Sequence, residues 1–178
     1  MSEVLTLIRE LPPEAAVLTA AALPVLELRG AIPLGVFYFG MPVWKVLLFS
    51  LVGNILPVPL LLILLRPLNA LSRRWGPSRR FFEWLYDRAQ RKGVSVKRLG
   101  ALGVFLFVAV PMPGTGAWMG SVIAEVFGLP FGLAFISITL GVLTAGVLVS
   151  LASYVGWWAV LLLFSALALL SFIVAKRR

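Results

Sequence analysis

The sequence has 178 residues, of which 61% are hydrophobic and 13% charged, with a mean hydropathy of +1.02 and a net charge of +9. A soluble domain of this length cannot hide so much apolar surface, so we predict a single all-α integral membrane domain over residues 1–178. The chain has no cysteine and no histidine, which excludes disulfides, thiol nucleophiles, histidine bases and Cys/His zinc sites. We therefore expect no metal, no cofactor and no enzymatic activity.

The first apolar region, residues 15–40, is interrupted by Pro24, Pro33 and Gly35. These helix-breaking residues predict a hairpin that enters the membrane from outside and returns to the same side. Glu27 and Arg29 lie inside this region, two positions apart, so they would not share one face of a regular helix. In a broken or extended segment they would point the same way.

The next apolar segment, residues 46–65, reads "VLLFSLVGNILPVPLLLILL" and carries no charge. Its length of about 20 residues is enough to cross a bilayer at a rise of about 1.5 Å per residue. Asn54, Pro57 and Pro59 within it predict a kink beside a cavity. The hairpin and this crossing together form the first predicted repeat, residues 15–65.

A basic linker, residues 66–98, follows the first repeat. Positive charge beside membrane spans predicts that it lies in the cytoplasm, and binding of anionic lipid headgroups is a second interpretation. We do not expect nucleic-acid binding. The stretch "SRRFFEWLYDRAQRK" spaces Phe81, Trp84 and Leu85 along one helical face, which predicts an amphipathic helix in the interface; a plain connector is the alternative. The positive residues are Arg66, Arg73, Arg74, Arg79, Arg80, Arg88, Arg91, Lys92, Lys97 and Arg98.

The second half of the chain contains three further uncharged segments. The first, Leu99 to Ala124, has "VPMPGTGAWMG" in its middle; Leu129 to Tyr154 and Trp157 to Ala175 follow. If all three crossed the membrane, the terminal Lys176, Arg177 and Arg178 would lie outside, against the positive-inside rule.

A hairpin that breaks at Pro111 to Gly116 and returns removes this conflict. We therefore predict a second repeat over residues 99–154, a C-terminal transmembrane helix within residues 155–178, and a cytoplasmic C-terminus.

Two stretches support an internal repeat. "FGMPVWKVLLFSLVG", residues 39–53, and "FGLPFGLAFISITLG", residues 127–141, share Phe, Gly, Pro and the final Gly at one constant offset. Each copy has one hairpin and one crossing, which is an odd number of passages, so the copies would have opposite orientations. This is an inverted-topology repeat.

Four charged residues lie within or beside apolar segments: Glu27, Arg29, Lys45 and Glu125. A charge at the centre of a bilayer costs about 2.5–3.5 kcal/mol on insertion scales, so it usually has a partner or faces water. We expect Lys45 to reach the outer interface. Glu27 and Arg29 either form a salt bridge that stabilises the hairpin or form a substrate or proton site. Glu125 is either a solvated hairpin end or a buried acid.

The returning arm of the second hairpin is expected to begin near Thr115 to Ala117. Helix N-termini carry unpaired N–H groups that bind anions, and Thr115 would cap this helix or donate to a phosphate. With Arg29, this predicts an anion-selective cavity. The candidate substrate-binding residues are Glu27, Arg29, Gly30, Pro33, Asn54, Pro113, Gly114, Thr115 and Gly116, and the candidate proton-coupling residues are Glu27 and Glu125.

The stretches "ELRGAIPLG…FGMP…GN" and "VPMPGTGAW…FGLP" resemble the bacterial and archaeal small multidrug export proteins, a family similar to the DedA/VTT superfamily. The resemblance covers about Pro24 to Tyr154. It implies paired re-entrant hairpins, a transporter-like role in a prokaryotic inner membrane, and, for the superfamily, movement of phosphate-headed lipids, sometimes with protons. It places Glu27, Arg29 and the Gly114–Gly116 turn in the site.

Our first hypothesis is therefore a transporter or flippase for an anionic, lipid-like substrate, in contact with membrane lipids. The alternatives are a proton-coupled exporter of cationic drugs that uses Glu27 and Glu125, and a non-transporting assembly factor. A chain this small rarely encloses a wide pathway by itself, so a homodimer is a further expectation.

Overall fold

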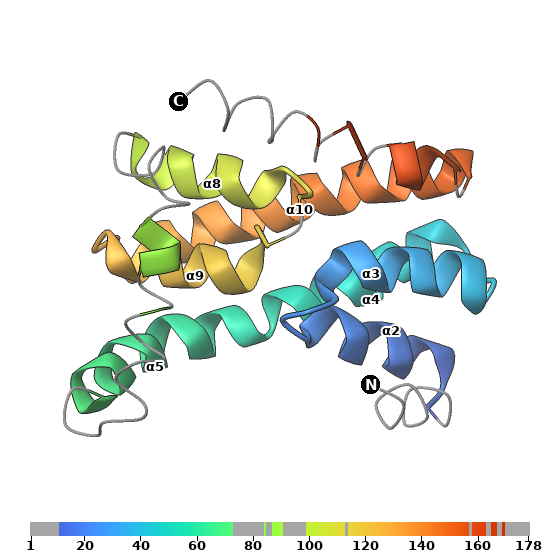
Figure 1. Ribbon diagram of the computed structural model, residues 1–178. Helices are drawn as coiled ribbons and strands as arrows, with labels where there is room; N and C mark the ends of the chain where they lie inside the picture. Colours follow the sequence, from blue (N-terminus) through green and yellow to red (C-terminus); the bar gives the residue numbers. More distant parts are fainter. Residues whose placement is uncertain are drawn as a thin grey trace. The chain divides into compact units, whose positions relative to one another are not determined.

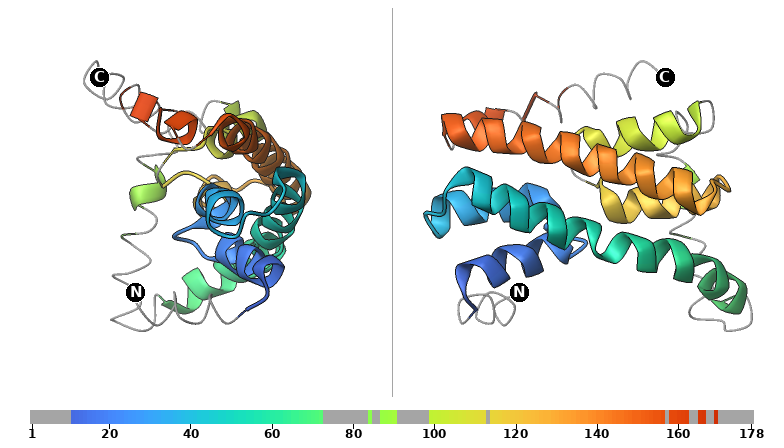
Figure 2. Two further views of the ribbon diagram at one scale, coloured as in Figure 1. Left: turned by 90° about the vertical axis from the view of Figure 1, so that its right-hand side faces the viewer. Right: turned by 180° about the vertical axis from the view of Figure 1, so that it is seen from behind.

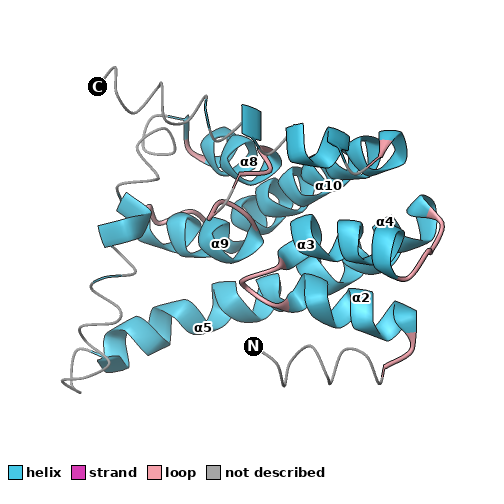
Figure 3. Cartoon of the chain, turned by 45° about the vertical axis from the view of Figure 1, so that its right-hand side comes forward, coloured by secondary structure: helices cyan, strands magenta, loops and turns pink. Residues whose placement is uncertain are grey.

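The computed structural model describes residues 11–72, 84, 87–90, 99–112, 114–156, 158–162, 165–166 and 169, and within them it contains helices and turns but no strand (Figures 1 and 3). The helices group into two compact units. Unit 1 comprises Met1–Asn54, Pro111–Gly114 and Leu143–Arg178, and unit 2 comprises Ile55–Val110 and Thr115–Val142.

Unit 1 begins with a helical hairpin. Helix α2 (Pro13–Ala22) starts with a proline at its first position, where the missing N–H costs nothing, and ends before the turn that contains Pro24. Helix α3 (Glu27–Pro33) returns along α2 and continues as the π-helical turn η1 (Leu34–Tyr38). Residues 15–40 therefore form a helical hairpin with one break instead of several, and its entry into the membrane stays a prediction.

Pro33 and Gly35 do not interrupt the returning arm, contrary to our expectation. The chain passes through them by widening its hydrogen bonds, since the Phe39 amide donates to the Leu34 carbonyl five residues before it. Gly35 is needed for packing, because a Cβ added there would lie 2.6 Å from the nearest methyl group of Val46.

Helix α4 (Val43–Ile55) follows the hairpin and is separated from α5 (Pro57–Ser72) by a turn at Leu56. The prolines at positions 57 and 59 cannot donate to the preceding turn, which explains the predicted kink. Within unit 1, α4 packs on α2 so closely that a Cβ on Gly53 would lie 2.2 Å from the Leu18 carbonyl oxygen.

The last half of α10 (Phe131–Val155) completes the described part of unit 1. A Cβ added to its Gly146 would lie 3.0 Å from Leu47 and 3.1 Å from Leu51 of α4, so the two helices are in close contact there. The two helices run in opposite directions, as Figure 2 shows.

Unit 2 contains a second helical hairpin. Helix α8 (Ala101–Ala109) and helix α9 (Ala117–Val126) pack on each other, and α9 also packs on α5. The first half of α10 lies against α8, because a Cβ on Gly141 would lie 2.7 Å from Val108 Cβ and 3.0 Å from the Phe105 carbonyl oxygen. The break predicted between Pro111 and Gly116 is confirmed.

Two helical stretches are long and apolar enough to cross a membrane: Val43–Leu65 and Phe131–Val155. Their exposed faces are apolar over their whole length. On the first, exposed side chains recur every four residues, and on the second every three or four. Such stripes would be unfavourable in water and suit a lipid environment. The residues are Trp44, Leu48, Val52, Leu56 and Leu60, and then Leu133, Ile136, Leu140, Leu143, Val147, Leu151 and Tyr154.

The element boundaries of the two halves correspond at an offset of 88 residues. Helix α2 starts at residue 13 and α8 at 101, while α4 starts at 43 and α10 at 131. Both returning arms end one residue before a phenylalanine, at 38 and at 126. Gly40 and Gly128 then have nearly the same left-handed φ, 61° and 67°. The sequence similarity between residues 39–53 and 127–141 is thus accompanied by equal local structure.

Two predicted segments lie largely outside the described residues. In the basic linker, residues 66–72 belong to the end of α5, and residues 84 and 87–90 are also helical. The Arg88 guanidinium lies 5.5 Å from the centre of the Trp84 ring. In the predicted C-terminal span, residues 158–162, 165–166 and 169 are helical. The interfacial helix and the last transmembrane helix remain predictions.

Candidate functional site

The turn of the first hairpin places an acid and an arginine next to each other. Glu27 is the first residue of α3 and has a φ of 49°, the only positive φ of a non-glycine residue in the part of the chain that the structure describes. A left-handed conformation costs a residue with a Cβ about 1–2 kcal/mol, so the surrounding structure must enforce it. Because α3 begins at Glu27, the side chains of Glu27 and Arg29 are not turned to different faces, as they would be in the middle of a regular helix.

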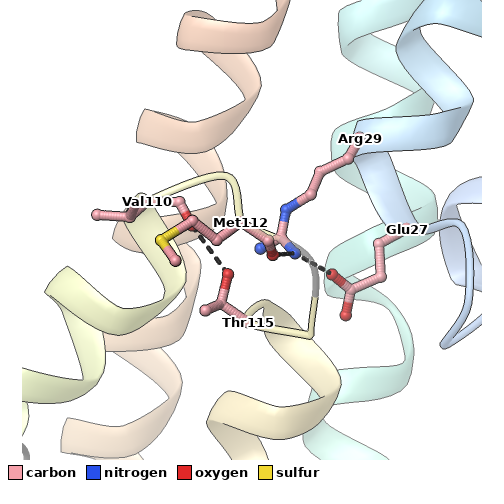
Figure 4. A network of polar contacts seen from close by, with 5 residues as sticks. All are labelled: Glu27, Arg29, Val110, Met112 and Thr115. Atoms are coloured by element: carbon pink, nitrogen blue, oxygen red, sulfur yellow. Dashed lines mark hydrogen bonds and ion pairs between the residues drawn. The ribbon is translucent and has the colours of Figure 1, made fainter. Parts of the chain in front are cut away.

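The Glu27 and Arg29 side chains form a buried ion pair. Arg29 Nη1 lies 3.7 Å from Glu27 Oε2, and the two side chains are 11% and 6% exposed, respectively. Figure 4 shows the guanidinium between the Glu27 carboxylate and the backbone of Met112. The same Nη1 donates a hydrogen bond of 2.5 Å to the Met112 carbonyl oxygen. Within unit 1, Arg29 therefore joins α3 to the Pro111–Gly114 segment.

The turn of the second hairpin contains no charged residue. Gly114 and Gly116 have φ values of 76° and 125°, which residues with a Cβ rarely adopt. The Thr115 hydroxyl donates a hydrogen bond of 2.9 Å to the Val110 carbonyl oxygen, as Figure 4 also shows. Within unit 2, this hydrogen bond joins the end of the turn to Val110, the residue that follows α8.

The suggestion that Thr115 caps α9 is wrong. The N-cap residue is Gly116, and no side chain caps the helix. The reason is geometric: the extended Gly116 separates Thr115 from the first helical turn, and its hydroxyl is used by Val110.

The other predicted site residues are placed as follows. Gly30 is half-buried in α3, where an added Cβ would lie 3.0 Å from Leu26, and Pro33 is buried at the end of the same helix. Asn54 is buried on α4, and Glu125 is half-buried near the end of α9. Pro113 lies outside the described residues. Whether any of them binds a substrate stays a prediction.

Sequence reasoning missed the partner of Lys45. The Lys45 ammonium donates a hydrogen bond of 2.5 Å to Glu14 Oε1, which joins the first turn of α4 to the first turn of α2. Both side chains are about one-third exposed. This hydrogen bond is the main reason why the pKa of Glu14 lies below its ordinary value. An acid in the first turn of one helix and a lysine after the proline of another were the available signals.

A known protein family matches this sequence. The family model described as "Putative small multi-drug export protein" matches residues 27–148, from Glu27 to the second half of α10. This range covers more than half of the chain, begins with Glu27 directly after the first hairpin turn, and includes the second turn. No curated protein and no solved structure matches this sequence.

Proposed function

The chain belongs to the family of small multidrug export proteins, and on that premise we propose that it exports small molecules across a membrane. The observation that carries the proposal is the buried pair of Glu27 and Arg29 at a hairpin turn. Ionisable residues within apolar membrane segments are expensive, and they usually mark a substrate or ion pathway.

The lengths of the hairpin arms support a re-entrant arrangement. Helices α2 and α9 have 10 residues each and α8 has 9, so these three arms reach about 15 Å, or half of a hydrocarbon core of about 30 Å. We propose that each hairpin enters the membrane to its middle and turns back. Each copy then makes one full crossing, so the copies have opposite orientations, with the basic linker and the C-terminus in the cytoplasm.

In the proposed mechanism, Glu27 is the exchangeable group. Its carboxylate has Arg29 as a neighbour in the described conformation. A cationic drug replaces the guanidinium at the carboxylate on one side of the membrane, and a proton neutralises the carboxylate when the drug leaves on the other. The family description names drugs as the exported molecules, which supports a drug as the substrate.

A second candidate is an anionic, lipid-like substrate with a phosphate headgroup. The observation in its favour is that an Arg29 N–H contacts a backbone carbonyl oxygen, an acceptor that a phosphate oxygen would replace. Gly114 follows two positions later in the same segment, where a backbone without a Cβ allows close approach of a ligand.

Two charge-neutralising variants separate these candidates in proteoliposomes. Glu27→Gln removes the proposed exchange group, and Arg29→Gln removes the anion donor. A drug exporter should lose proton-driven efflux of a cationic dye in Glu27→Gln and keep or increase it in Arg29→Gln. A lipid flippase should lose movement of a fluorescent phospholipid in Arg29→Gln.

The matched control is Glu14→Gln, the same chemical change in an acid of α2 that is about one-third exposed. It should retain transport. If folded wild-type protein moves neither probe, the exporter proposal is wrong, and a role as an assembly factor takes its place.

A further inference from the structure

Two polar side chains are enclosed on one face of α4. Ser50 is 0% exposed and Asn54 is 1% exposed. Neither the Ser50 hydroxyl nor the Asn54 side-chain carbonyl oxygen has a hydrogen-bond partner among the described residues. The two residues are four positions apart, so their side chains are neighbours on the helix. Buried polar atoms without partners are rare, which makes a missing ligand a reasonable explanation.

Packing alone does not require polar residues at these positions. At the same offset of 88 residues, α10 has Ile138 and Val142, and both are also 0% exposed. Equivalent, equally buried positions are therefore filled by aliphatic side chains in the second copy. The polarity of Ser50 and Asn54 is a property of the first copy only.

A backbone carbonyl oxygen lies close to Gly53, the residue before Asn54. Gly53 lets the last turns of α4 contact the C-terminal half of α2, with an added Cβ 2.2 Å from the Leu18 carbonyl oxygen and 3.1 Å from Ala21 Cβ. Both helices end here, and a helix C-terminus carries a partial negative charge. The Gly53 carbonyl also lacks its usual helical donor, because Pro57 has no N–H.

We propose that this place binds a monovalent cation, with Na⁺ as the probe ion. Asn54 Oδ1 and the Ser50 hydroxyl oxygen supply side-chain ligands, and carbonyl oxygens at the ends of α2 and α4 supply the rest. Uncharged oxygens suit Na⁺ because a divalent ion in such a site usually needs carboxylates. Carbonyls at broken helices bind coupling cations in transporters. Use of the cation to drive export depends on the function proposed above, whereas its binding does not.

Thermal unfolding of the full chain tests the binding. The purified protein is heated in detergent while Na⁺ replaces choline at constant ionic strength, and unfolding is followed by tryptophan fluorescence. Binding should raise Tm in a saturable way, on the order of 5 °C at a Na⁺ concentration 100 times Kd. An equal Tm in Na⁺ and choline would overturn the proposal, leaving water as the occupant.

Substitutions that introduce the corresponding residues of the second copy test whether Na⁺ binds at Ser50 and Asn54. Asn54→Val and Ser50→Ile should remove the Na⁺-dependent rise in Tm, whereas Asn54→Asp should shift its midpoint to lower Na⁺ concentration. The control is Thr139→Val, since the buried Thr139 hydroxyl also lacks a partner within the described residues but lies in unit 2. It should respond as wild type does.

The two proposals fail separately, because this readout involves no transport. If Asn54→Val does not fold, Asn54→Asp alone decides the matter: an unchanged midpoint would contradict a site at Asn54. A wild-type response in Asn54→Val would contradict it as well.

Discussion

In the first hairpin, the start of α3, directly after the turn, carries an acid and an arginine, whereas the turn between α8 and α9 carries a threonine between two glycines. The backbone positions of the two hairpins correspond at 88 residues, including their first residues and the glycines that follow them. Glu27 corresponds to Thr115 and Arg29 to Ala117.

Comparing the two copies distinguishes residues that the packing of the fold requires from residues that serve function. Features that both copies have, such as a glycine at 53 and at 141 where helices meet, belong to the packing of the fold. Features that only one copy has cannot be required by that packing. The Glu27–Arg29 pair and the polar face of α4 are of this second kind, and we therefore assign function to them.

The largest expected effect comes from breaking the charged pair. Arg29→Met leaves the Glu27 carboxylate buried without its counter-charge and the Met112 carbonyl without this donor. The free energy of unfolding should fall by about 3–5 kcal/mol, as for other buried pairs that lose one partner. Unfolding by SDS in mixed micelles measures it.

The double variant Glu27→Gln plus Arg29→Met is the control for this prediction. It should regain most of the lost stability, because no unpaired charge remains. Equal losses in the single and the double variant would show that the charges do not interact.

The next effect compares the glycines that both copies share. Gly53→Ala places a methyl group 2.2 Å from a backbone oxygen, and Gly141→Ala places one 2.7 Å from a side-chain carbon. We expect losses of about 1–3 kcal/mol, larger for position 53, because backbone moves less easily than a side chain. Gly132→Ala in α10 meets nothing within 4 Å and should gain up to about 1 kcal/mol from helix propensity. Equal changes in the free energy of unfolding for all three substitutions would contradict the described packing.

A smaller effect is expected in the uncharged turn. Thr115→Val removes the hydrogen bond to the Val110 carbonyl and should cost about 1 kcal/mol of unfolding free energy. Thr115→Ser keeps the hydroxyl and serves as the control. If both substitutions cost the same, the methyl group and not the hydroxyl holds this turn.

The smallest effect concerns the pair outside both turns. The pKa of Glu14 is lowered in the folded chain, so its contribution to stability is present above the ordinary glutamate pKa and disappears as the pH falls through the lower, folded value. Wild type should therefore lose stability below about pH 4.5. Lys45→Met should remove that part of the pH dependence, as Tm measured from pH 7 to pH 3 will show. An identical pH profile in the variant would contradict the pairing.

Much of the fold follows from the sequence because helix breakers and apolar runs act locally. Pro24 and the Pro111–Gly116 cluster each predicted a turn where one is found, and Pro57 predicted the break at Leu56. Pro33 misled us, since a π-helical turn absorbed it without breaking the helix, and local sequence does not distinguish these outcomes.

The site was less accessible to sequence reasoning. Glu27 and Arg29 stood out because charge is rare in apolar segments. The contact of Arg29 with Met112 joins residues 83 positions apart, and the Lys45–Glu14 pair spans 31 positions. Such contacts depend on tertiary packing. The missing partners of Ser50 and Asn54 became evident only once burial was known.

We propose that both hairpins turn back within the membrane, each from its own side. The native chain has no cysteine, so the single variants Pro12→Cys, Pro42→Cys, Leu99→Cys and Pro130→Cys, all at exposed positions, can be labelled with a membrane-impermeant maleimide without background. We predict that positions 12 and 42 react from the outside and positions 99 and 130 only from the cytoplasmic side. Labelling of positions 99 and 130 from opposite sides would show a complete crossing between them and contradict the account.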